Sequence, residues 1–296
     1  MKANSQVRGL TYAIISASAF GMLGLFSVPC LRAGMSTLSI VFYRFVIGSI
    51  AMLAIVLWGR RNMRITKRDF WQIMLLAASN NFSAYTMILG YNYMSSGAAQ
   101  TIQFSYPIFT CLIMILFFHE RLTWRIALSI ALAVVGVGCI SGTGDMSQFP
   151  IKGVSIELAS GLIYAIYLVM IPMMRINRLD SSVLTFYIFL FSALQWLFIS
   201  PFTGGFGAIP SWSIGGSLIM MGLVPTVLSN FALVLALKSV GSTLSSICGA
   251  MEPVTAMLCG AIAFGEPVTA VVMVGFVAIV TSVMLLIVKP VTACER

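Results

Sequence analysis

Three ionisable residues, Arg44, Glu157 and Glu252, lie inside long apolar stretches of the sequence. A charged side chain at the centre of a hydrocarbon layer costs about 2.5–3.5 kcal/mol on insertion scales, so each of them calls for a partner or a function. A buried carboxylate or guanidinium group could bind a polar solute, and a carboxylate could also carry a proton. The alternative for each residue is a structural role in holding helices together.

Arg44 and Glu157 are predicted to lie at similar depth. Arg44 is about seven residues into its apolar stretch, or roughly 10 Å at 1.5 Å per residue, and Glu157 lies four residues into another that begins on the same side. One hypothesis is a substrate clamp, or a gate closed by an Arg44–Glu157 ion pair. The alternatives are that Arg44 binds helix-end carbonyl groups and that Glu157 reaches the membrane interface.

Glu252 directly precedes Pro253. A proline inside a helix removes one hydrogen bond and would free the carbonyl group of Gly249, four residues back. A free carbonyl group beside a carboxylate could receive an ammonium group or a proton. The alternative is a protonated or paired glutamate that locks neighbouring helices together.

Neutral polar residues recur in the same apolar stretches, several of them at helical spacing. For each one, contact with a neighbouring helix is as good an explanation as contact with a substrate. Taken together, they predict a cavity rich in amide and tyrosine groups, which suits a small zwitterion or an uncharged polar metabolite. The candidates beside the three ionisable residues are Tyr43, Asn80, Asn81, Tyr85, Gln100, Gln103, Tyr106, Tyr164, Tyr167 and Asn230.

The composition explains why these residues lie in apolar surroundings. Of the 296 residues, 59% are hydrophobic and only 8% are charged, against about 25% charged in ordinary soluble domains. A spanning helix needs roughly 20 apolar residues. This rule predicts ten membrane-spanning helices, at about 9–29, 37–58, 70–94, 97–118, 124–140, 153–174, 182–199, 214–237, 241–264 and 268–288.

The distribution of basic residues predicts the orientation of these helices. With the N-terminus inside, every Lys and Arg except Arg32, Arg44 and Lys152 falls on the inner side. An excess of Lys and Arg marks cytoplasmic loops, so we expect both termini to be inside. The net charge of +9 therefore indicates loops near an anionic membrane surface, and a nucleic-acid partner is disfavoured.

The two halves of the chain repeat one pattern. Pro107 precedes Glu120 by 13 residues, and Pro253 precedes Glu266 by the same spacing, 146 residues further on. We expect two five-helix repeats, residues 1–145 and 146–296, and an odd number of helices inverts the second repeat. Inverted repeats are typical of secondary transporters, which bind substrate near the middle of the membrane. Glu120 and Glu266 are expected to have a structural role at helix ends.

These features resemble the EamA-type exporters of the drug/metabolite transporter superfamily. The resemblance is carried by the ten spans, by Tyr43-Arg44-Phe45 and by Pro107…Glu120 with its counterpart Glu252-Pro253…Gly265-Glu266. It implies a central cavity walled by the first four helices of each repeat, a peripheral fifth helix, and export of amino acids or other small metabolites across a bacterial inner membrane. The sequence departs from symmetry where Tyr106 corresponds to Glu252, so any role of that acid belongs to one repeat.

Other classes of function find less support. The single histidine, the lack of a Ser/His or metal constellation and six cysteines without CxxC spacing disfavour an enzyme, a metal site and a cofactor. There is no GxxxxGK[ST] loop for ATP. A channel fits the proline-broken helices less well than alternating access does. An importer or exchanger of the same fold, proton coupling and a homodimer remain open.

Overall fold

The computed structural model describes residues 2–93, 96–118, 123–141, 151–264 and 270–287, and these residues form helices and the turns between them, with no strand. Glu120, Glu266 and the expected boundary at residues 145–146 lie outside the described residues. The α-helices are α1 (Lys2–Gly21), α2 (Leu23–Arg32), α3 (Thr37–Trp58), α4 (Lys67–Gly90), α5 (Ser96–Gln103), α6 (Tyr106–Phe118), α7 (Trp124–Ser141), α8 (Ile151–Met173), α9 (Ser181–Ile199), α10 (Trp212–Met221), α11 (Ser229–Cys248), α12 (Met251–Phe264) and α13 (Ala270–Ile287). Two short 3₁₀ segments, η2 (Arg175–Arg178) and η3 (Ser200–Phe202), and a π-helical segment, η4 (Gly222–Leu228), complete the elements.

Five segments of the described chain are long and apolar enough to cross a membrane. Large apolar side chains face outward from several helices; Phe198 is 78% exposed and Ile262 is 85% exposed. Water would not stabilise such a surface, whereas lipid would. The remaining apolar helices are shorter. The five segments are Gln6–Arg32, Thr37–Trp58, Ile151–Met173, Ser181–Phe202 and Trp212–Cys248.

Two of the expected continuous spans are each broken in the middle. The span expected at 97–118 divides into α5 and α6, with a turn at Phe104 and Ser105, and the span expected at 241–264 divides at Gly249 and Ala250. Pro107 and Pro253 fall in the first turns of α6 and α12. Proline is favoured there because the first backbone N–H groups of a helix have no intrahelical partner. These prolines therefore begin new helices instead of bending existing ones.

The long segment that ends at Cys248 contains a second discontinuity. At Gly241, φ is 81° and ψ is 179°, so the backbone leaves the helical conformation there. Glycine tolerates this positive φ because it has no Cβ. The turn separates the helix that starts at Trp212 from the short helix that precedes the Gly249 break. The expected boundary between residues 237 and 241 is thus close to the observed one.

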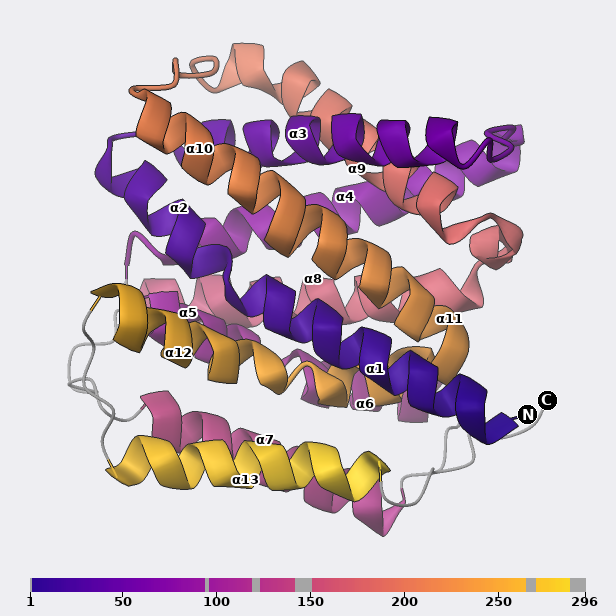
Figure 1. The fold of residues 1–296 in the computed structure, drawn as a ribbon, viewed down its shortest axis with the longest axis vertical. Helices are drawn as coiled ribbons and strands as arrows, with labels where there is room; N and C mark the ends of the chain where they lie inside the picture. Colours follow the sequence, from indigo (N-terminus) through magenta and orange to yellow (C-terminus); the bar gives the residue numbers. More distant parts are fainter. Residues whose placement is uncertain (1, 94–95, 119–122, 142–150, 265–269, 288–296) are drawn as a thin grey trace.

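The helices lie side by side in layers and cross the molecule from one side to the other, with α1, α10 and α11 inclined to α3 and α13 (Figure 1). α1 packs along α11, α4 packs along α8, and α3 packs against α9. α7 and α13 form a pair at one edge (Figure 1), joined by reciprocal hydrogen bonds between the hydroxyl and carbonyl groups of Ser129 and Ser282. The polar residues of interest lie on α3, α4, α5, α6, α8, α11 and α12.

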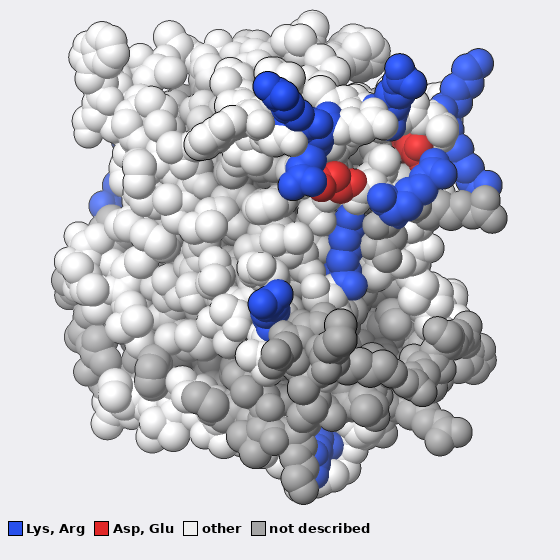
Figure 2. Space-filling model, turned by 45° about the vertical axis from the view of Figure 1, so that its right-hand side comes forward, with Lys and Arg blue, Asp and Glu red and all other residues white. Residues whose placement is uncertain are grey.

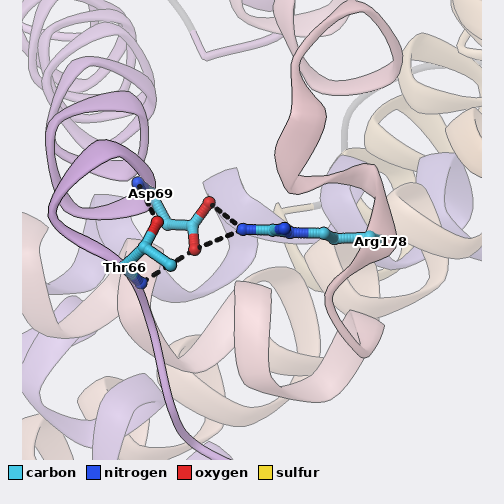
Figure 3. A network of polar contacts seen from close by, with 3 residues as sticks. All are labelled: Thr66, Asp69 and Arg178. Atoms are coloured by element: carbon cyan, nitrogen blue, oxygen red, sulfur yellow. Dashed lines mark hydrogen bonds and ion pairs between the residues drawn. The ribbon is translucent and has the colours of Figure 1, made fainter.

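Basic side chains gather at one end of the molecule, around two acidic groups (Figure 2). At this end, Arg178 Nη2 donates hydrogen bonds to both carboxylate oxygens of Asp69 at 3.0 Å, and Asp69 forms a capping box with Thr66 at the start of α4 (Figure 3). Arg61 pairs with Asp180 at 3.4 Å. These contacts join the start of α4 and the segment before it to the segment between α8 and α9.

Candidate functional site

The two broken helices meet at their breaks. Tyr106 begins α6, Glu252 lies in the first turn of α12, and the Tyr106 hydroxyl donates a hydrogen bond of 2.9 Å to Glu252 Oε1. The two residues are 146 positions apart, which is the offset of the sequence repeat. Tyr106 is 1% exposed and Glu252 is 7% exposed, so the bond lies in the core. A helix N-terminus favours a nearby negative charge, which suits a carboxylate at this position.

Gly249 makes room for this contact. A Cβ atom at Gly249 would overlap the Tyr106 hydroxyl, so a larger residue there would displace the tyrosine. The prediction that Pro253 frees the Gly249 carbonyl group is wrong, because that carbonyl accepts a hydrogen bond of 2.8 Å from the backbone N–H of Glu252. The reason is that Gly249 precedes α12 and is part of the turn that starts it.

Arg44 lies on α3 and is 2% exposed. Its Nε donates a hydrogen bond of 2.6 Å to the hydroxyl of Thr226, and its guanidinium carbon lies 5.6 Å from the centre of the Phe20 ring. Thr226 belongs to the π-helical segment η4 and donates in turn to the Met221 carbonyl group at 2.8 Å. Arg44 Nη1 has no hydrogen-bond partner.

Glu157 lies on α8, is fully buried, and has no hydrogen-bond partner on either carboxylate oxygen. Among the described residues, the expected ion pair between Arg44 and Glu157 is not present in this conformation. Arg44 instead uses the Thr226 hydroxyl, which the π-helical turn presents to α3. The alternative that Glu157 reaches the membrane interface does not match its burial.

Tyr91 and Gln100 lie near Glu157. Gln100 Nε2 donates a hydrogen bond of 3.1 Å to the Tyr91 hydroxyl, and Gln100 Oε1 has no partner. Tyr91 directly follows Gly90, and a Cβ atom at Gly90 would overlap Glu157 Oε1. Tyr91 therefore lies beside Glu157 and Gln100, although its place just after a helix end gave no signal for it in the sequence.

An aromatic cluster connects Arg44 to Glu252. The Phe20 ring stacks on Tyr164 at 6.1 Å between centroids, and Tyr164 meets Tyr106 edge-on at 4.9 Å. Tyr167 also stacks on Tyr164, with the two ring centroids 5.9 Å apart. The Tyr167 hydroxyl has no hydrogen-bond partner among the described residues. The structure thus brings Arg44, Tyr106, Tyr164, Tyr167 and Glu252 together.

Other candidates make contacts between or within helices. Asn81 Nδ2 donates to the Ser192 carbonyl group and to Gln195 Oε1, both at 3.2 Å, and the Tyr85 ring packs on Trp196 at 5.0 Å. These contacts fasten α4 to α9 and favour the structural alternative for both residues.

Gln103 Nε2 donates to the Ser160 hydroxyl at 3.2 Å, and Asn230 Nδ2 donates to the Thr226 carbonyl group at 3.0 Å. Asn80 is buried, and its Nδ2 has no partner. Tyr43 lies apart from the cluster; its hydroxyl donates to the Gly207 carbonyl group at 3.0 Å. Among the described residues, no group of three or more His, Cys, Asp or Glu side chains could hold a metal ion.

Comparison with known proteins finds similarity to membrane transporters. The model of the EamA-like transporter family matches residues 7–142 and again residues 151–288. The uncharacterized transporter YdfC of Bacillus subtilis is 26% identical over 270 residues, covering 88% of this chain and 87% of that protein. A probable terminal-alkyne amino-acid exporter of Streptantibioticus cattleyicolor is 23% identical over 97% of this chain and 94% of its own length.

A solved crystal structure has a similar fold. It aligns with a TM-score of 0.78 over 96% of this chain and 97% of that chain, at 15% sequence identity. At this identity the likeness concerns the fold alone.

Proposed function

The chain belongs to the EamA-like transporter family, and we propose that it is a secondary transporter that exports amino acids or similar small polar metabolites by alternating access. The similarity to a probable amino-acid exporter supports this substrate class. Arg44 Nη1, Glu157 and Gln100 Oε1 support it too, because they are buried hydrogen-bonding groups without a partner among the described residues. Burying such a group without a hydrogen bond costs free energy, and a bound polar substrate would supply the missing partner.

The observation that carries this proposal is the hydrogen bond between Tyr106 and Glu252. It joins the starts of two half-helices at positions that correspond in the two halves of the sequence. Secondary transporters place substrate and coupling-ion sites at the ends of broken helices near the repeat interface. In our proposal, the Tyr106–Glu252 bond breaks and re-forms as the two repeats move, and Glu252 carries a coupling proton.

The arrangement in the membrane is part of the proposal. We place ten spans in two inverted repeats, residues 1–145 and 146–296, with both termini in the cytoplasm of a bacterial cell. The basic end seen in Figure 2 supports this orientation, because it holds the segment 59–68, which is rich in Arg and Lys. Arg32 is the last residue of α2, and Lys152 lies in the first turn of α8. In the proposed orientation both residues are on the outer side of the membrane.

Transport in proteoliposomes tests the proposal. The purified chain is reconstituted, and counterflow of amino acids and other small metabolites is measured with and without a pH gradient. We expect amino acids to exchange, a pH gradient to accelerate net movement, and Glu252→Gln to lose that acceleration while still exchanging substrate. An unchanged pH response in Glu252→Gln would exclude the coupling role of Glu252. Net uptake of substrate in a separate assay with intact cells would favour an importer.

A further inference from the structure

We propose that Glu157, together with Gln100, binds the primary ammonium group of the transported substrate. This inference rests on the proposed function and narrows its substrate class to compounds with a free amino group. It starts from one observation: the Glu157 carboxylate is fully buried, and neither of its oxygens has a hydrogen-bond partner. An isolated buried carboxylate is strongly unfavourable, so it either takes up a proton or binds a donor that the described residues do not supply.

The charged groups around Glu157 are already engaged or distant from it. Arg44, on α3, donates to Thr226 and forms no ion pair with Glu157. Lys152, at the start of the same helix α8, lies over the ring of Tyr93 with its Nζ 5.3 Å from the ring centre. Glu252, on α12, accepts from Tyr106. Among the described residues, Glu157 therefore has no cation to neutralise it.

Gln100 offers an unpaired acceptor near Glu157. Gln100, on α5, uses its amide nitrogen to reach the Tyr91 hydroxyl, which leaves its carbonyl oxygen without a partner. Tyr91 directly follows Gly90, which packs against Glu157 Oε1, so Gln100 and Glu157 both contact the turn at Gly90 and Tyr91. An ammonium group has three donors and no acceptor, which fits two carboxylate oxygens and an amide oxygen. A hydroxyl group offers one donor, and an N-acetylated amine offers one donor and much greater bulk.

Gly90, the last residue of α4, shows how closely the carboxylate is held. A Cβ atom at Gly90 would overlap Glu157 Oε1, so only glycine leaves the carboxylate in its place. The change Gly90→Ala therefore moves the proposed ligand group without altering its charge. Gly216 on α10 is a matched control, because a Cβ atom there would meet nothing within 4 Å.

The experiment uses the purified full chain in liposomes loaded with a matched mixture at one fixed pH. The mixture holds the protein amino acids, their N-acetyl derivatives, and the 2-hydroxy acids with the same side chains. Mass spectrometry follows which compounds leave. We expect only compounds with a free amino group to leave, and their efflux to fall on the order of tenfold or more in Glu157→Gln and in Gly90→Ala. Gly216→Ala should transport like the wild type.

Thermal unfolding separates this role from a structural one. Glu157→Gln keeps the size of a side chain that has no hydrogen-bond partner among the described residues, so its unfolding temperature should stay the same or rise while transport falls. Efflux of 2-hydroxy acids or N-acetyl derivatives at the rate of amino acids, or normal amino-acid efflux by Glu157→Gln, would overturn the ammonium site and leave a transporter standing. Retention of every compound by the wild type would instead reject the proposed export, and this inference with it.

Discussion

Arg44 shows how a charge can be accommodated in an apolar core without a counter-ion. Its guanidinium group is held by the Thr226 hydroxyl at 2.6 Å and lies 5.6 Å and 5.5 Å from the centres of the Phe20 and Phe45 rings. Aromatic faces attract cations, and this attraction is stronger away from water. One hydrogen bond and two rings therefore fix the side chain while one terminal nitrogen remains without a partner.

The change Thr226→Val should destabilise the protein by about 1.5–3 kcal/mol, because it removes a hydrogen-bond acceptor from a buried charged group. Thermal or denaturant unfolding of the purified protein in detergent measures this cost. Thr281→Val is the control, since Thr281 is exposed and its hydroxyl bonds only to the Val277 carbonyl group one turn away. Equal stabilities of the two variants would contradict the role of Thr226.

The sequence singled out three ionisable residues but not their partners. Arg44, Glu157 and Glu252 stand out because charges are rare in apolar stretches, and all three are buried. The predicted Arg44–Glu157 pair is not formed in this conformation, because Arg44 binds Thr226 in a π-helical turn that leaves no periodic signal in the sequence. Tyr91 and Gly90 were missed because a glycine and a tyrosine at a helix end are ordinary there.

At the scale of helices, the two breaks at Phe104–Ser105 and Gly249–Ala250 determine which residues meet at the centre. Apolar content alone predicted two unbroken spans there, since the residues at the breaks are as apolar or small as their neighbours. The prolines were the available signal, but each could bend a helix or begin one. Only the backbone geometry shows that Tyr106 and Glu252 stand at helix starts and face each other.

The Tyr106–Glu252 bond can be measured by a double-mutant cycle. Tyr106→Phe and Glu252→Gln should each lower the free energy of unfolding, and the double variant should lose less than the sum, by about 0.5–3 kcal/mol. Tyr106→Phe combined with Ser129→Ala is the control, because Ser129 belongs to the separate α7–α13 pair and should add independently. If the losses of Tyr106→Phe and Glu252→Gln added as fully as those of Tyr106→Phe and Ser129→Ala, the hydrogen bond would contribute no coupling energy.

The contacts at the basic end predict a dependence of stability on pH. Burial favours the neutral form of Asp69, but hydrogen bonds from Thr66 and the charge of Arg178 outweigh it, so the pKa of Asp69 is below its ordinary value. A lowered folded-state pKa gives stabilisation that is present above the unfolded value of about 3.9 and is lost as pH falls through the folded value.

Asp69→Asn should therefore cost about 1 kcal/mol at pH 7, a modest value because Arg178 is largely exposed. The cost should shrink as the pH falls below about 4, where the wild type also loses its charge. Unfolding temperatures across this pH range measure the difference. Arg64→Gln, an exposed change in the same segment, should follow the wild type at every pH; a cost of Asp69→Asn that did not change with pH would exclude the charge as its source.

At the scale of the whole molecule, the proposed division into two repeats agrees with two observations. The family model matches the two halves separately, and the central hydrogen bond joins residues one repeat apart. The expected peripheral place of the fifth helices agrees with the position of α7 and α13 at one edge (Figure 1). A pattern of apolar runs predicts such an arrangement well, because each run must become a helix that satisfies its own backbone.

The orientation in the membrane gives the last prediction. Asn62 lies in the exposed segment between α3 and α4 at the basic end, and Ala208 lies in the exposed segment between η3 and α10 at the other end of α9. In a variant with its six cysteines replaced, single cysteines are introduced by Asn62→Cys or Ala208→Cys. If the basic end faces the cytoplasm, a membrane-impermeant maleimide should label only the Ala208 position in intact cells and both positions after permeabilisation. Labelling of the Asn62 position in intact cells would reverse the proposed topology. It would also reverse the side of the membrane that each end of the helices carrying Glu157 and Glu252 faces.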